Sequence, residues 1–315
     1  MSTWVPIIRK PAIIRGVNIL LFGANGQVGW ELQRALLPLG RLTALGREEA
    51  DLAHPVADHV LRLRPDVVVN AAAYTAVDKA ESETELAQRV NAGAVAELAQ
   101  ACEQIGALFV HYSTDYVFDG TKATAYLETD ATAPLSAYGC TKLAGENAIR
   151  AIPFCRHLIF RTSWVYALRG RNFARTILQR AQERDHLEVI ADTFGAPTSA
   201  DLIADVTALA IYRFSQGRDT AQLGTFHLVP DGFVSWHGYA QFLVEAARAA
   251  GMHVRVHPEN VVAVSSDRFP APAQRPRNSR LDNSLLQRAY GLTLPPWQLH
   301  VERVVRQIAA TNANA

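Results

Sequence analysis

The chain has 315 residues, a formal net charge of +1 and a sequence pI near 7.8. This length accommodates two lobes, and the near balance of charge excludes a broad basic surface for nucleic acid or an anionic membrane. We find no apolar run of membrane-spanning length and therefore expect no membrane partner. Three cysteines without metal-like spacing indicate reduced thiols and a cytoplasmic protein: Cys102, Cys140 and Cys155.

The start of the chain predicts an extension followed by a phosphate-binding unit. Residues 1–16 contain basic residues and only short apolar runs, so we expect a poorly ordered N-terminal extension. Residues 17–22 form an apolar run typical of a buried parallel strand, and a helical pattern covers residues 30–37. Between them lie glycines that allow a pyrophosphate to approach a helix N-terminus, in the turn Gly23-Ala-Asn-Gly26-Gln27-Val28-Gly29. We therefore predict an α/β fold with a Rossmann-type doubly wound parallel sheet.

The second predicted strand, residues 41–45, ends close to Arg47. In a dinucleotide fold the residue at this position contacts the adenosine ribose. An arginine there can pair with the 2′-phosphate and therefore favours NADP(H) over NAD(H). An exposed loop arginine is the alternative interpretation. Asp51 and Leu52 follow where they could meet the adenine edge.

A third strand is predicted at residues 65–70, and the small residues after it leave room for a cofactor that crosses the sheet edge. A long amphipathic helix is expected at residues 83–105. Asn91, a polar residue between apolar neighbours on that helix, would brace the backbone of the adjacent strand or lie at the surface. The stretch after the third strand ends at Ala73, Tyr74 and Thr75.

Two hydroxyl-bearing segments follow. The strand at residues 107–112 leads to Ser113 and Thr114, and strand alternation favours Thr114 as the donor to a substrate carbonyl oxygen. Tyr138 and Lys142 are one helical turn apart, so a lysine cation would lie beside a phenol and lower its pKa. This pair is a candidate general acid or base.

Beyond residue 160 the pattern loosens. We predict strands at residues 187–190 and 225–229 and helices at residues 200–214 and 238–250. We expect residues 17–165 to form the cofactor domain. Residues 166–315 would form mainly a smaller α/β substrate lobe, with some segments returning to the first domain. Residues 267–280 contain four arginines and would either clamp a diphosphate or form a solvated linker.

These motifs together resemble the dTDP-4-dehydrorhamnose reductase family. The likeness lies in the glycine turn and in residues 70–81, 113–120 and 138–146, and it extends through residues 161–166, 195–198 and 275–281. It covers the chain from Val17 to about Arg306. The resemblance implies NAD(P)H-dependent reduction of the C4 ketone of dTDP-4-dehydro-L-rhamnose to dTDP-L-rhamnose. NADPH is the expected cofactor and NADH the alternative.

The resemblance also assigns residues. The cofactor would contact the glycine turn, Asp51, Leu52, residues 73–75 and Tyr112, and the dTDP-sugar would contact Thr114, Asp115, Tyr116 and Trp164. Tyr138 and Lys142 would be the catalytic pair, and both would also contact the cofactor, Lys142 at the nicotinamide ribose. For Trp164, a partly buried core aromatic is the alternative interpretation.

Other functions remain open from the sequence. A nucleotide-sugar dehydratase or epimerase is similar, but Tyr116 stands where such dehydratases have a glutamate. A non-catalytic NADP(H)-binding regulatory subunit is a second alternative, and the Thr114, Tyr138 and Lys142 set argues against it. The family can form a homodimer that shares Mg²⁺ through carboxylates, for which Glu31 is a candidate. The mostly neutral or basic stretch 297–307 argues against that metal and that dimer.

Overall fold

Six parallel strands form the central sheet in the computed structural model, which describes residues 16–216 and 222–313. The spatial order is β10-β5-β4-β3-β1-β2, and every neighbouring pair is parallel. Nearly all of the predicted N-terminal extension lies outside the described residues. The strands of this sheet are β1 (Val17–Phe22), β2 (Gly40–Leu45), β3 (Val67–Asn70), β4 (Leu108–Thr114), β5 (His157–Thr162) and β10 (Gly224–His227).

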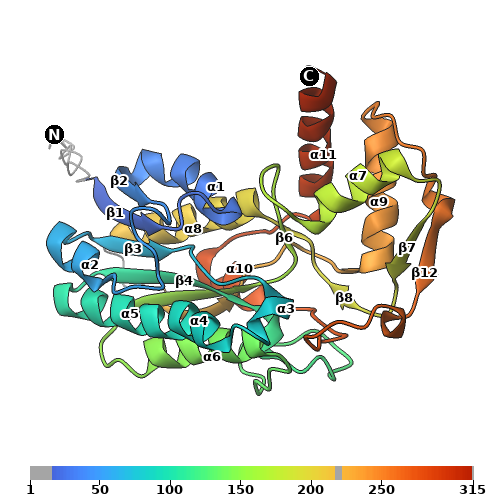
Figure 1. The fold of residues 1–315 in the computed structure, drawn as a ribbon. Coiled ribbons are helices and arrows are strands. Elements are labelled where there is room, and N and C mark those ends of the chain that lie inside the picture. Colours follow the sequence, from blue (N-terminus) through green and yellow to red (C-terminus); the bar gives the residue numbers. More distant parts are fainter. Residues whose placement is uncertain (1–15, 217–221, 314–315) are drawn as a thin grey trace, which may run out of the picture.

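Both faces of this sheet are buried, which explains the nearly continuous apolar runs of its strands. In β1, Ile19 and Leu21 join a core beneath one layer of helices, whereas Leu20 and Phe22 join a separate core on the other face. Figure 1 shows α1 and α8 on one side of the sheet and α5 and α6 on the other. The predicted doubly wound α/β class is confirmed.

The helices around the sheet come from both halves of the chain. One layer contains α1 (Gln27–Leu36), α8 (Ala200–Ser215) and α10 (Ser284–Tyr290), whose residues share a core with the sheet. Thus α8, β10 and α10 return from the second half of the sequence. The other elements of this part are α2 (Ala57–Leu63), α3 (Val77–Ala80), α4 (Thr84–Gln88), η2 (Arg89–Gly93), α5 (Ala94–Ile105), η3 (Asp115–Val117) and α6 (Ala137–Arg150), with η1 (Leu37–Leu39) after α1.

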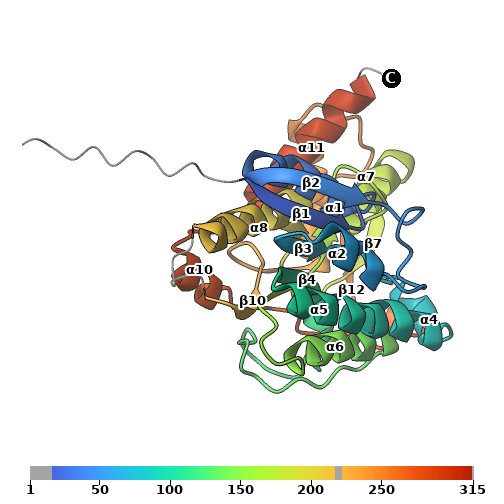
Figure 2. The same cartoon turned by 90° about the vertical axis from the view of Figure 1, so that its left-hand side faces the viewer.

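A smaller lobe with its own core lies beyond the carboxyl edge of the sheet. Its main helices are α7 (Phe173–Glu183), α9 (Trp236–Ala249) and α11 (Trp297–Ala313). In both cartoon views the far end of α11 projects away from the rest of the molecule (Figures 1 and 2). The remaining elements of the second half of the chain are short strands and turns: β6 (Val165–Tyr166), β7 (Leu187–Ile190), β8 (Phe194–Gly195), β9 (Thr198–Ser199), β11 (Val234–Ser235), η4 (Pro258–Asn260), β12 (Val261–Val264) and η5 (Ser266–Arg268).

The predicted elements are present, with shifted bounds and one structural correction. Strands 17–22 and 187–190 have their predicted bounds, whereas β4 continues two residues further and includes Thr114. The helix predicted at 83–105 is wrong as a single α-helix, because a π-helical segment interrupts it at η2. Asn91 lies in that segment, where its side chain accepts from the Tyr74 amide at 2.9 Å and donates to the Tyr74 carbonyl at 3.1 Å. Asn91 thus braces backbone as predicted, but in the loop that follows β3 and not in the strand itself.

Across residues 16–216 and 222–313, none of the helices combines the length and apolarity needed to cross a bilayer.

The most deeply buried ion pair among the described residues ties α6 to the sheet. Glu146 on α6 is fully buried and accepts from Arg161 Nε at 2.9 Å and Nη2 at 2.7 Å, and Arg150 adds a third contact. This pair fixes the helix that carries Tyr138 and Lys142.

We expect the Glu146→Gln substitution to lower the free energy of unfolding by about 3–5 kcal/mol, because the buried Arg161 cation loses its carboxylate. Urea titration measures this change. Asp185→Asn is the matched control, because Asp185 pairs with Arg255 at 2.7 Å on the surface, and such exposed pairs contribute about 0–1 kcal/mol. Equal losses in the two variants would contradict an anchoring role for the buried pair.

Candidate functional site

A cavity of about 970 Å³ lies at the carboxyl ends of β1, β3 and β4 and extends to the second lobe. Strand order reverses between β1 and β3, and ligands of doubly wound sheets bind at such a switch point. Gly29 and Glu31 are the two predicted site residues that do not line this cavity. The other predicted residues all line it: Gly23, Gly26, Gln27, Val28, Arg47, Asp51, Leu52, Ala73, Tyr74, Thr75, Tyr112, Thr114, Asp115, Tyr116, Tyr138, Lys142 and Trp164.

The glycine turn forms one end of the cavity. Gly26 is the N-cap of α1, and no side chain caps this helix, so N–H groups of its first turn remain for a ligand. A Cβ at Gly29 would lie 2.0 Å from the Gly23 carbonyl oxygen, so only glycine lets α1 begin so close to the turn. Gly29 therefore acts through backbone packing, and the uncapped turn fits a pyrophosphate.

Arg47 lies at the rim of the cavity with 78 % of its side chain exposed, and its Nε donates to Asp51 at 3.1 Å. Asp51 also accepts from the Ala53 amide, and this bond, followed by the Arg47 contact, holds the pKa of the carboxyl below its usual value. The guanidinium is free on its solvent side. Arg47 and Asp51 are thus brought together, and Leu52, the third residue predicted at the adenosine end of a cofactor, lines the same cavity.

Tyr138 is placed by the start of α6. Ser136 caps the helix by accepting from the Gly139 amide at 3.2 Å, and a Cβ at Gly139 would lie 2.4 Å from the Tyr116 carbonyl oxygen. The glycine thus lets the first turn of α6 pack directly on η3, with the Tyr138 and Tyr116 rings edge to face at 5.7 Å. Burial raises the pKa of the Tyr138 phenol to about 12, against a smaller lowering by its hydrogen bond with Thr114.

This pKa corrects the sequence-based expectation. Lys142 was expected to lower the pKa of Tyr138, but burial dominates and the net shift is upward. The Lys142 ammonium donates instead to the Tyr112 carbonyl at 2.6 Å and lies 3.2 Å from His111 Nε2. Burial in turn lowers the pKa of Lys142 to about 8, although the Glu146 charge opposes this shift. Tyr138 therefore keeps its proton at neutral pH, as a general acid requires.

Thr114 and Ser113 face different surroundings, as strand alternation predicts. Thr114 Oγ1 donates to Asp115 Oδ1 at 2.9 Å and accepts from the Tyr116 amide at 3.2 Å, on the Tyr138 side. Ser113 lies next to Glu146. Burial raises the pKa of Asp115 to about 6, and its bonds to neighbouring groups limit that shift. Thr114 is therefore the hydroxyl beside the phenol.

Trp164 has a strained backbone, with φ of 48°, and its ring stacks on Trp236 at 3.5 Å between centroids. A Cβ at Gly195 would lie 2.6 Å from the Trp164 indole, so the stack depends on that glycine. Trp236 was not predicted from the sequence, since nothing in its spacing marks it. Asn25, Lys79 and Ser163 lie within the motifs named above but were not singled out as site residues, and Glu83 and Arg171 lie outside any motif.

Glu31 lies outside the cavity, on α1. It is 3.6 Å from Arg34, and burial raises its pKa, followed by the charge of Asp201 on α8. In the part of the chain that the structure describes, no group of three or more His, Cys, Asp or Glu side chains is arranged to hold a metal ion.

The arginines of residues 267–280 all have partners within the chain. Arg268 pairs with Glu188 at 2.9 Å, Arg275 with Asp78 at 2.7 Å and Arg277 with Asp267 at 3.3 Å. Arg280 donates to the Asn278 side chain at 2.7 Å. These contacts attach the segment to α3 and β7, and Arg275 also lies next to the Tyr116 phenol. The segment is thus held against the protein and is not a free linker.

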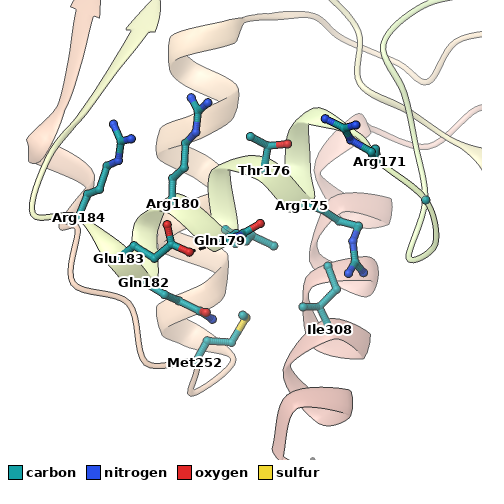
Figure 3. A pocket seen from close by; sticks show the side chains of 12 residues that line it. Arg171, Arg175, Thr176, Gln179, Arg180, Gln182, Glu183, Arg184, Met252 and Ile308 are labelled. Atoms are coloured by element: carbon teal, nitrogen blue, oxygen red, sulfur yellow. Dashed lines mark hydrogen bonds between the residues drawn. The ribbon is translucent and has the colours of Figure 1, made fainter.

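A second hollow, of about 610 Å³, lies along α7 beside Met252 and Ile308. In Figure 3, Arg180 and Arg184 point to one side, whereas Arg175 points toward Ile308 on α11. Apart from Arg171, which lines both hollows, its lining residues are absent from the larger cavity. The candidate catalytic residues all lie in the larger one.

Comparisons with known proteins agree with this geometry. Residues 17–310 match the family described as the RmlD substrate binding domain. The chain is 52 % identical over 303 residues to a dTDP-4-dehydrorhamnose reductase of Shigella flexneri, covering 94 % of this chain and all of that protein. A crystal structure of the dTDP-4-dehydrorhamnose reductase from Bacillus anthracis in complex with NADP has a TM-score of 0.82 and 32 % identity, and covers 93 % of this chain and 99 % of that one. A Thermus thermophilus UDP-glucose 4-epimerase, 19 % identical with a TM-score of 0.74, shares the fold. The chain belongs to the dTDP-4-dehydrorhamnose reductase family.

Proposed function

We propose that this protein reduces the C4 ketone of dTDP-4-dehydro-L-rhamnose to dTDP-L-rhamnose with NADPH as the hydride donor. One observation carries the proposal: the partly buried Tyr138 phenol, Thr114 and the uncapped glycine turn line one cavity. The family membership supplies the substrate class. The dTDP-sugar would lie between the sheet edge and the Trp164–Trp236 stack, which offers an apolar surface to a pyranose ring.

The residues of the cavity fit the cofactor and the chemistry. The first turn of α1 would hold the pyrophosphate, and the wall at residues 73–75 would line the path toward Tyr138. The bound nicotinamide supplies a hydride. Tyr138 would give its proton to the oxygen on which negative charge develops, and Thr114 would turn its hydroxyl from Asp115 toward that oxygen. Lys142, as an ammonium, would favour the phenolate that remains.

We further propose a cytoplasmic enzyme, since its cysteines are unpaired among the described residues. A homodimer is also compatible with the chain, and light scattering of the purified protein tests it. The division into a cofactor domain at 17–165 and a substrate lobe mainly at 166–315 is part of the same proposal. It accounts for the separate core of α7, α9 and α11.

Tyr138→Phe should reduce the turnover number for ketone-dependent NADPH oxidation by roughly 10²–10⁴-fold, the contribution of a general acid. Binding of NADPH, followed by fluorescence, should remain within a few-fold of wild type. Tyr116→Phe is the matched variant, because it removes the phenol in edge-to-face contact with Tyr138. A larger loss in Tyr116→Phe would transfer the acid role to Tyr116. No oxidation by wild type with cofactor bound would favour a regulatory subunit.

Arg47→Ala should raise the KM for NADPH about tenfold and leave the KM for NADH nearly unchanged, because only NADPH carries the 2′-phosphate. Steady-state kinetics with both cofactors measures the ratio. Arg41→Ala is the control, since Arg41 is exposed on β2 near the opposite end of that strand. Equal changes for NADPH and NADH would show that Arg47 does not recognise the phosphate.

A further inference from the structure

A buried row of three polar side chains connects the sheet to the catalytic helix. Asn70 lies on β3, His111 on β4 and Lys142 on α6, and each is at most 2 % exposed. Asn70 Nδ2 is 3.3 Å from His111 Nδ1, and His111 Nε2 is 3.2 Å from Lys142 Nζ. Asn70 and His111 are register partners in the sheet. The reaction outlined above uses Lys142 but gives no role to the other two side chains.

The direction of these hydrogen bonds follows from a backbone donor. The Ala72 amide donates to Asn70 Oδ1 at 3.1 Å, which fixes the orientation of the side-chain amide. Asn70 Nδ2, which can only donate, then faces His111 Nδ1. His111 Nδ1 must therefore be the acceptor, and the single proton of the neutral imidazole lies on Nε2. Burial, followed by the Lys142 charge, lowers the pKa of His111 well below its usual value, so the ring stays neutral.

This tautomer places an N–H group against Lys142. An ammonium has three N–H donors and no lone pair, so it cannot accept the proton of His111 Nε2. A neutral amine can accept from Nε2 while it donates to the Tyr112 carbonyl at 2.6 Å. We propose that His111, oriented by Asn70, is a positioning residue that makes Lys142 give up its proton more easily. The catalytic consequence rests on the reductase function proposed above, whereas the proton affinity of Lys142 does not.

The other charged and polar groups around Lys142 do not favour its neutral amine in the way that His111 does. Glu146, one turn further along α6, favours the ammonium, but two arginines share its charge: Arg161 from β5 and Arg150. Tyr138 lies one turn earlier and stays neutral, and Asp115 follows β4 on the Thr114 side. The Tyr112 phenol bonds Thr207 on α8, and Asn91 of η2 bonds Thr141, so neither side chain compensates Lys142. Among the described residues around Lys142, His111 is thus the neutral neighbour that directs a donor at it.

The consequence concerns the pH range of catalysis. The phenolate left after proton transfer is favoured only while Lys142 is charged, so reduction should weaken as the pH rises through the pKa of Lys142. Without the His111 donor, Lys142 should remain charged to higher pH, and the basic limb of the kcat/KM profile should shift to higher pH. The profile of wild type should fall above about pH 8.

The test titrates Lys142 directly in the cofactor-free protein. The chain has four lysines, Lys10, Lys79, Lys122 and Lys142, so ¹³Cε-lysine labelling gives a simple spectrum in which Lys142→Arg assigns the signal. His111→Phe removes the donor and should raise the pKa of Lys142 by about one unit, roughly tenfold in proton affinity. His111→Gln can present an amide N–H in its place and should stay near wild type. Asn70→Ala frees the ring to change tautomer and should also raise the value.

An unchanged Lys142 titration in both His111→Phe and Asn70→Ala would overturn the proposal, and so would an equal rise in His111→Gln. The basic limb of the kcat/KM profile is the second readout and should move in parallel. If wild type does not reduce the ketone but the lysine titration shifts as described, the proposed function fails and the role of His111 stands. If the ketone is reduced and the titration does not shift, the role of His111 fails alone.

Discussion

Burial of ionisable groups at the edge of a doubly covered sheet is the constraint on which the site depends. Because helices cover both faces, buried polar side chains near the carboxyl edge of the sheet, such as Asn70 and His111, need partners among one another and in the covering layer of helices. Tyr138 and Lys142 lie in that layer, and burial shifts both pKa values away from the charged forms. Desolvation therefore prepares a protonated acid next to a lysine that releases its proton readily.

The packing of α6 makes this burial achievable. Gly139 lets the helix rest on the Tyr116 backbone, and a Cβ at Gly145 would lie 2.2 Å from the Asn91 carbonyl oxygen. Further along the helix, the Glu146–Arg161 pair fixes it to β5. These contacts hold one face of α6 close against the sheet, and Lys142 on that face is buried. The same close approach brings His111 within hydrogen-bonding distance of the ammonium.

Much of the fold follows from sequence patterns, because buried parallel strands and glycine turns leave strong local signals. The strand Val17–Phe22, the glycine turn and the pairing of Tyr138 with Lys142 were predicted in this way, whereas Tyr112, Asp115 and Trp164 came from the family resemblance. The π-helical segment around Asn91 was not, since it arises from packing and has no propensity signal. The pKa of Tyr138 was predicted with the wrong sign, because a spacing of four residues reveals a neighbour but not the depth of burial. The Trp164–Trp236 stack joins segments 72 residues apart, beyond the reach of any local pattern.

In the proposed reaction, hydride reaches C4 of the sugar while Tyr138 supplies the proton. The most direct measurement uses NADPH deuterated at the transferable position of the nicotinamide, with dTDP-4-dehydro-L-rhamnose as substrate. NMR and mass spectrometry of the product locate the label. We expect one deuterium on C4 of a dTDP-6-deoxyhexose. Deuterium at another carbon, or a product without deuterium, would contradict it.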